Sequence, residues 1–173
     1  GPHIGALWAK RDLIERLDLP KLDPAPDTSP ERLETGTQNH EGIVGAAAAV
    51  DYLATLADDP GLSHRQALAS TFRSVHERGV ELFELLWEGL GDIKRVRRYG
   101  LPPGARRSPT LAFRVEGVPC DEVAGALAHR GLFVSHGDFY AATVIERLGV
   151  GPDGVVRVGC SIYTTREEIE RVV

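Results

Sequence analysis

Residues 63–91 read SHRQALASTFRSVHERGVELFELLWEGLG and form the longest periodic segment of the chain. Ser63 and Gln66 match a capping-box pattern, which marks the start of a helix. Gly89 or Gly91 marks its end. Arg, Glu and His separate apolar residues that recur at helical spacing, namely Leu68, Phe72, Val75, Leu82, Leu86 and Leu90. The segment therefore predicts one long amphipathic helix, whose apolar face needs a second layer to cover it.

The residues after this helix predict that second layer. Leu111, Phe113 and Val115 alternate with smaller or charged residues, which is the period of a half-buried strand. A helix is predicted over 121–130, ending at Gly131, and a capping box at Thr165 opens a last helix. Four stretches are strand-like: 93–99, 111–115, 132–135 and 155–160. The order predicts an α/β fold, in detail a small α+β domain with helices packed on one sheet.

The residues before the long helix predict a separate piece of structure. An apolar run at 4–9 predicts a buried strand. Four prolines make residues 18–30 an irregular loop. Asn39 is a good cap for an alanine-rich helix over 42–56. Together these elements need a partner sheet, so we interpret residues 1–56 as a piece separate from the structure that begins at residue 63.

Composition excludes several classes of function. A net charge of −5 argues against a nucleic-acid binder, because phosphate contacts require a basic surface. No apolar run approaches the roughly 20 residues that span a bilayer. The two cysteines and six scattered histidines show no disulfide framework and no metal-ligand spacing. We therefore expect a cytoplasmic protein with no metal, nucleic-acid or membrane partner. The basic residues at 94–98 and 106–107 are interpreted as a solvated edge strand and loop, or alternatively as an electrostatic patch.

Two turns could carry a function. Gly36 and Thr37 precede the alanine-rich helix, and backbone N–H groups with a hydroxyl at a helix start suit a phosphate. The alternative is a plain cap. His136 and Asp138 lie in a glycine-bearing loop after a predicted strand, where they could act as acid or base. The alternative is a simple Ser/Asp turn.

Arg157 is the third candidate. It lies on the opposite strand face from Val156 and Val158, where a guanidinium could hold a carboxylate through two parallel hydrogen bonds. The alternative is a solvated strand arginine.

Taken together, these residues resemble the class V aminotransferase family, in particular its cysteine-desulfurase-like branch. GPHIGALW (residues 1–8) is similar to the segment that follows the family's Schiff-base lysine. ETGTQN (34–39) resembles the family's Glu-x-Gly-Thr-Pro-Asn turn. Arg157 followed by YTTREEI (163–169) resembles its C-terminal Arg and Tyr-Asn-Thr-x-x-Glu-Ile pattern. The three motifs occur in the family's order over the whole chain.

The resemblance implies a fold-type I enzyme that uses pyridoxal 5′-phosphate (PLP) on an amino acid. Residues 1–60 would be the end of the large PLP-binding domain, and residues 61–173 the small C-terminal α/β domain. Gly36 and Thr37 would bind the PLP phosphate, Thr37 reaching the cofactor of the neighbouring subunit in a homodimer. Arg157 would bind the substrate's α-carboxylate.

The departures from the family concern catalysis. The lysine would lie three residues before Gly1, and the chain has no methionine, so we expect an inactive C-terminal fragment of an active parent enzyme. Desulfurases carry a cysteine in the loop that here reads Ser135 to Asp138. This chain has no cysteine there, so the expected reaction moves away from sulfur transfer. The alternative function is a non-catalytic α+β interaction or dimerisation domain.

Overall fold

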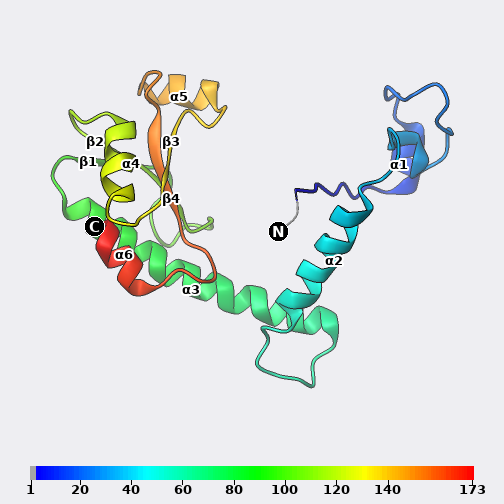
Figure 1. The fold of residues 1–173 in the computed structure, drawn as a ribbon, viewed down its shortest axis with the longest axis horizontal. Helices are drawn as coiled ribbons and strands as arrows, with labels where there is room; N and C mark the ends of the chain where they lie inside the picture. The colour runs from blue at the N-terminus through cyan, green and yellow to red at the C-terminus, as the bar shows by residue number, and fades with distance from the viewer. Residues whose placement is uncertain (1–2) are drawn as a thin grey trace. The chain divides into compact units, whose positions relative to one another are not determined.

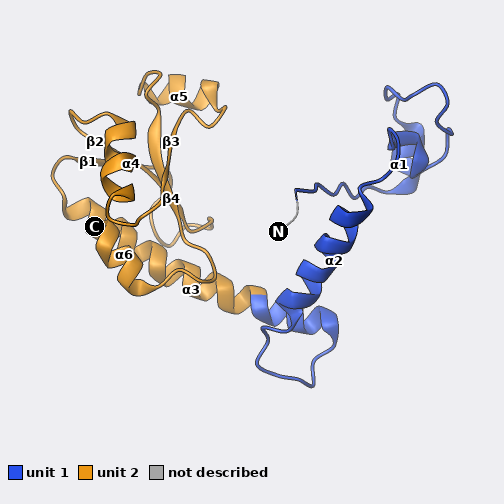
Figure 2. Cartoon of the chain, in the orientation of Figure 1, with its two compact units in different colours: residues 1–71 blue, residues 72–173 orange. Residues whose placement is uncertain are grey.

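The computed structural model describes residues 3–173, so Gly1 and Pro2 of the Gly-Pro-His motif lie outside the described residues (Figure 1). The chain divides into unit 1 (Gly1–Thr71) and unit 2 (Phe72–Val173), which Figure 2 colours separately. The boundary falls inside one continuous helix. The assignment of residues 1–60 to a PLP-binding domain and of 61–173 to a small domain stays a prediction.

The elements follow one another along the chain as α1 (Arg11–Arg16), η1 (Glu31–Leu33), α2 (His40–Ala54), α3 (His64–Asp92), β1 (Val96–Tyr99), β2 (Thr110–Val115), α4 (Cys120–Ala128), β3 (Ser135–Gly137), α5 (Ala142–Leu148), β4 (Val155–Gly159) and α6 (Arg166–Val172). The predicted class is confirmed, since helices pack on a small sheet.

Unit 2 is built on an antiparallel sheet of four strands in the order β1-β2-β4-β3. The buried side chains of β2 and β4 lie against the apolar faces of α3, α4 and α6, so one face of the sheet is covered by helices. This core contains Leu82, Phe83, Leu86, Leu90, Leu111, Phe113, Cys120, Val156, Val158 and Ile169. Because side chains alternate along a strand, Ala112 and Arg157, which are register partners, lie on the opposite face.

Two predicted helix ends of unit 2 are confirmed, the stop of α4 and the capping box of α6, whereas α3 runs to Asp92, one residue past Gly91. Gly131 ends α4 with a φ of +76°, which glycine adopts without steric cost. There the Leu132 N–H donates to the Leu127 carbonyl at 3.0 Å, closing the last turn. At α6, the Glu168 N–H donates to Thr165 Oγ1 at 3.2 Å, and the Thr165 N–H donates to Glu168 Oε2 at 2.8 Å.

Few side chains of unit 1 are buried, and hydrogen bonds fix its helices. Asn39 caps α2 as predicted, since its Oδ1 accepts a hydrogen bond from the Gly42 N–H at 2.9 Å. The start of α3 is joined to α2 by the Thr71 hydroxyl, which donates to the Leu53 carbonyl at 3.0 Å. Ala67 is the one buried apolar residue among those described in this unit.

Two predictions about the elements were wrong, and two short helices were not predicted. Residues 4–9 form no strand, and Leu7 and Trp8 are 83% and 82% exposed, because the described part of unit 1 offers no second strand to pair with. The third strand of the sheet lies at Ser135–Gly137 instead of 132–135, because Leu132 completes the end of α4. The short helices α1 and α5 were not predicted, since neither is long enough to show a period.

Candidate functional site

Arg157 is one of the residues that line a hollow on the face of the sheet opposite the helices. It is exposed, and its guanidinium carbon lies 3.9 Å from the centre of the Phe139 ring. Its register partner on β3 is Ser135. The hollow measures about 550 Å³, and its lining includes Ser108, Thr110, Phe133, Ser135, Arg157 and Gly159. The residues around the hollow thus supply one cation, hydroxyl groups and the Phe133 ring, while the Phe139 ring lies against the guanidinium.

The guanidinium of Arg157 keeps its N–H edge available. Within residues 3–173 it makes no hydrogen bond or ion pair, whereas Arg95, Arg98 and Arg107 all donate to backbone carbonyls. The guanidinium carbon lies over the face of the Phe139 ring, and a guanidinium that stacks on a ring keeps its in-plane donors free. A planar carboxylate can accept two parallel hydrogen bonds from that edge.

The structure gives neither of the two other loop candidates, His136 and Asp138, a place in the hollow beside Arg157. Asp138 Oδ1 accepts a hydrogen bond from the Tyr140 N–H at 3.0 Å, so this carboxylate holds a turn. His136 pairs with Val156 in the strand register, so it lies on the opposite face of the sheet from Arg157. These positions favour the structural alternative for Asp138 and keep His136 away from the hollow.

Gly36 and Thr37 lie in unit 1, in the turn that leads into α2. The helix is capped by Asn39, and the Thr37 side chain is exposed and makes no hydrogen bond within the described chain. A Cβ at Gly36 would meet nothing within 4 Å. The turn from Leu33 to Asn39 lines an open depression of about 300 Å³. A free hydroxyl can donate a hydrogen bond to a phosphate oxygen, and the positive end of a helix dipole favours its negative charge.

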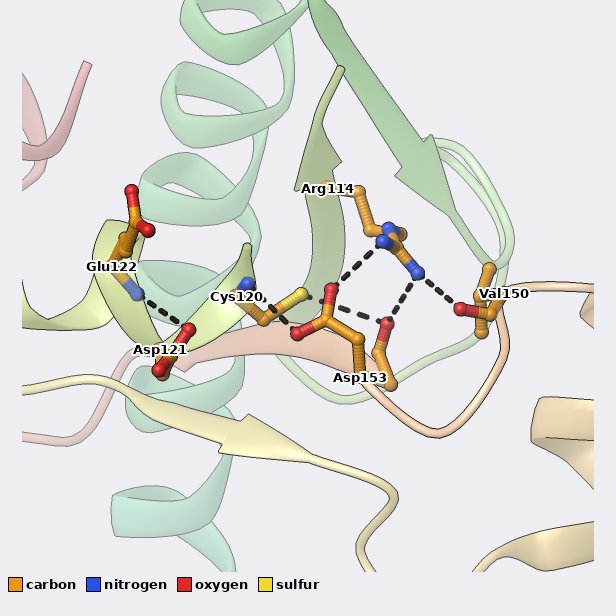
Figure 3. A network of polar contacts seen from close by, with 7 residues as sticks. Arg114, Cys120, Asp121, Glu122, Val150 and Asp153 are labelled. Atoms are coloured by element: carbon orange, nitrogen blue, oxygen red, sulfur yellow. Dashed lines mark hydrogen bonds and ion pairs between the residues drawn. The ribbon is translucent and has the colours of Figure 1, made fainter. Parts of the chain in front are cut away.

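A second polar network, drawn in Figure 3, connects β2, α4 and the loop before β4. The Asp153 carboxylate pairs with Arg114 at 2.8 Å and accepts a hydrogen bond from the Cys120 N–H at 3.0 Å. Arg114 also donates to the carbonyls of Val150 and Gly154. The network therefore fastens the start of α4 to the 149–154 loop.

This environment decides the ionisation of Cys120 and Asp153. Burial, followed by the hydrogen bond and charge of Asp153, raises the pKa of the Cys120 thiol to about 11. Burial also raises the pKa of Asp153, but hydrogen bonds from Cys120 and the charge of Arg114 outweigh it, and the net pKa lies below the ordinary value. Cys120 is thus a protonated packing residue. Sequence analysis missed this network, for which the Gly-Pro-Asp-Gly run at 151–154 was the available signal.

The described residues contain neither a metal-binding cluster nor a membrane-spanning helix. Among residues 3–173, no three His, Cys, Asp or Glu side chains gather into a group that could hold a metal ion. None of the helices in this range has the length and apolar character needed to cross a membrane.

Comparison with known proteins places the chain in a family. Residues 1–172 match the family model described as aminotransferase class-V. A cysteine desulfurase from Haloferax volcanii is 30% identical over 98% of this chain, and one from Pectobacterium carotovorum is 29% identical over 100% of this chain. The chain spans 38% and 41% of the lengths of these relatives.

Solved structures agree with the sequence comparison. A cysteine desulfurase from Thermococcus onnurineus superimposes with a TM-score of 0.67 and 26% identity, over 83% of this chain and 32% of that chain. A cysteine desulfurase from Escherichia coli, at 23% identity and a TM-score of 0.64, shares the fold over 84% of this chain and 31% of its own. The chain belongs to the class-V aminotransferase family, and within that family it resembles the cysteine desulfurases.

Proposed function

We propose that the protein containing this chain is a PLP-dependent enzyme acting on an amino acid, and that Arg157 binds the α-carboxylate of the substrate. One observation carries the proposal: a stacked guanidinium with a free N–H edge lies in a hollow lined by hydroxyl groups. The family relationship supports the choice of PLP-dependent chemistry.

Gly36 and Thr37 are proposed to hold the cofactor phosphate. When bound, PLP supplies an electron-accepting ring that stabilises negative charge on the substrate. This chain contributes binding and orientation: the Thr37 hydroxyl would donate to a phosphate oxygen, and Arg157 would fix one end of the substrate. In a homodimer, Thr37 would serve the neighbouring subunit's cofactor. Its exposure and its free hydroxyl support that role.

The loop sequence narrows the proposed reaction. Residues 135–138 contain no cysteine, burial raises the pKa of the Cys120 thiol to about 11, and burial also raises the pKa of the Cys160 thiol. Sulfur transfer needs a reactive thiolate. We therefore propose a reaction at the amino group or the α-carbon, such as transamination, epimerisation or elimination.

Borohydride reduction tests the enzyme proposal directly. The native protein containing these residues would be reduced and digested, and its peptides examined by mass spectrometry. A pyridoxyl-modified lysine three residues before the Gly-Pro-His sequence is the expected result. A native protein with no modified lysine anywhere would overturn the proposal.

The role of Arg157 is tested by Arg157→Lys, which retains the charge but loses the two-pronged donor geometry. We expect the KM for the amino-acid substrate to rise about tenfold or more, as a charge-assisted bidentate pair is lost. Arg73→Lys, at an exposed arginine on α3, is the matched control and should leave KM unchanged. Equal KM values for Arg157→Lys and wild type would remove Arg157 from substrate binding.

One observation favours the alternative of association without catalysis. α2 exposes four large apolar residues, with Ile43 48%, Val44 69%, Val50 43% and Tyr52 59% exposed. These side chains lie on more than one face of the helix, and a helix that is apolar on several faces is normally buried against neighbouring elements. If no pyridoxyl-lysine is found, light scattering should still show a dimer that Val44→Glu dissociates, whereas a monomeric wild-type protein would exclude association of this kind.

A further inference from the structure

The chain makes an unusual turn directly after β3. Phe139 and Tyr140 have φ values of +54° and +56°, and they are the non-glycine residues with left-handed backbone among those described. Residues other than glycine rarely adopt this backbone conformation, because their Cβ comes too close to the backbone. Two consecutive instances need support from their surroundings. Asp138 provides it, because its side chain accepts from the Tyr140 N–H and its carbonyl accepts from the Ala141 N–H at 2.9 Å.

The turn returns the chain to Arg157. Ser135 lies opposite Arg157 in the register, so a continued strand would carry residue 139 roughly 13 Å further along the sheet. Instead the turn sets the Phe139 ring 3.9 Å from the guanidinium carbon. The Tyr140 ring, next in sequence, is fully exposed. The turn therefore delivers one aromatic ring to Arg157 and leaves the other in solvent.

We infer that Phe139 is a positioning residue that holds the Arg157 guanidinium in the orientation that receives a carboxylate, and that Asp138 acts through Phe139 by holding the turn. The inference rests on the proposed function of Arg157. An arginine side chain has many rotamers, and fixing them costs binding free energy. A ring on the guanidinium face restricts them before the ligand arrives. Because the ring occupies the face, the N–H edge stays free for the carboxylate.

The stack has a spectroscopic signature. In the protein containing these residues, labelled with ¹⁵N-arginine, the Arg157 Nε–H proton should be shifted upfield by the ring current of Phe139. Phe139→Leu should abolish the shift, and Phe139→Trp should restore it. The internal control is Arg107, whose guanidinium lies 3.8 Å from the Phe83 ring. Its own signal should be unchanged in every variant that folds correctly. Tyr140→Leu is the matched control for loss of an aromatic side chain.

Titration with acetate then measures the consequence for binding. We expect Phe139→Leu to weaken acetate binding at the Arg157 signal by about threefold, the size of an exposed cation–π contact. Phe139→Trp should recover the wild-type affinity for acetate, and Tyr140→Leu should bind acetate with the wild-type affinity.

Three contrary outcomes are distinguishable. An Arg157 shift that is unaffected by Phe139→Leu shows that the stack does not exist and overturns the inference. A lost shift with unchanged acetate affinity shows that the stack does not position the guanidinium, and it also overturns the inference while the proposed function stands. A wild-type Arg157 that shows the ring-current shift but does not bind acetate overturns the proposed function, and the positioning role with it.

Discussion

The Asp153 carboxylate joins three segments of unit 2, because it binds Arg114 of β2 and the first N–H of α4 from the loop before β4. We predict that Asp153→Asn lowers the free energy of unfolding by about 2 kcal/mol at neutral pH, since hydrogen bonds to a charged group are lost. Asp121→Asn is the matched control, because its side chain accepts only from the neighbouring Glu122 N–H. Urea unfolding measures both. Equal stability of the two variants would show that the network contributes little.

The pH dependence follows from the lowered pKa of Asp153. A carboxyl with a lower pKa in the folded state stabilises the fold above its ordinary pKa of 3.8, and this contribution is lost as the pH falls through the folded value. The stability difference between wild type and Asp153→Asn should therefore be full at neutral pH and shrink on acidification below 3.8. Urea titrations at several acidic pH values check this. A difference that is constant with pH would contradict it.

The two cysteines should differ in reactivity. Cys120 is 1% exposed with a pKa of about 11, whereas Cys160 is only partly buried. Alkylation requires the thiolate and access to it. We predict that iodoacetamide modifies Cys160 at least about tenfold faster than Cys120 in the folded protein. Peptide mass spectrometry over time gives both rates, and faster modification of Cys120 would contradict its placement in the core.

At the scale of elements, the pairing of β3 with β4 depends on a close approach at Gly154. A Cβ there would lie 2.0 Å from the Gly137 carbonyl oxygen, whereas one at Gly151 would meet nothing within 4 Å. Both glycines have a φ of +69°. Gly151→Ala should cost about 1 kcal/mol for the left-handed backbone alone. Gly154→Ala should cost at least about 2 kcal/mol more, because the strands must separate. Thermal unfolding of the pair measures the difference, and equal costs would contradict the close approach.

At the scale of the whole molecule, the buried apolar residues are concentrated in unit 2. Its sheet and helices enclose Leu82, Leu86, Phe113 and Val156, whereas Ala67 is the buried apolar residue found in the described part of unit 1. Local stability follows buried apolar contacts. We predict that amides of β2 and β4 exchange on the order of 100-fold more slowly than those of α2 in the 173-residue chain. Hydrogen exchange followed by mass spectrometry tests this. Equal protection of the amides of α2 and of the two strands would contradict the prediction and show that unit 1 is stabilised by contacts other than buried apolar side chains.

The sequence by itself determined the elements whose signals are local. Caps and periodicity predicted α2, α3, α4 and α6, because a helix is specified by residues three or four positions apart. Alternation predicted β2 and β4. The family motifs identified the class-V aminotransferase relationship and gave Gly36, Thr37 and Arg157 as candidates for binding.

The tertiary structure alone decided which residues meet. Phe139 stacks on Arg157, and Asp153 binds Arg114, across 18 and 39 positions of sequence. No local pattern encodes such pairs, because they arise from the register of the strands and the turn after β3. The strand expected at residues 4–9 is wrong for the same reason: an apolar run shows a tendency to pair, but pairing needs a neighbouring strand, and only the assembled fold determines whether one is there.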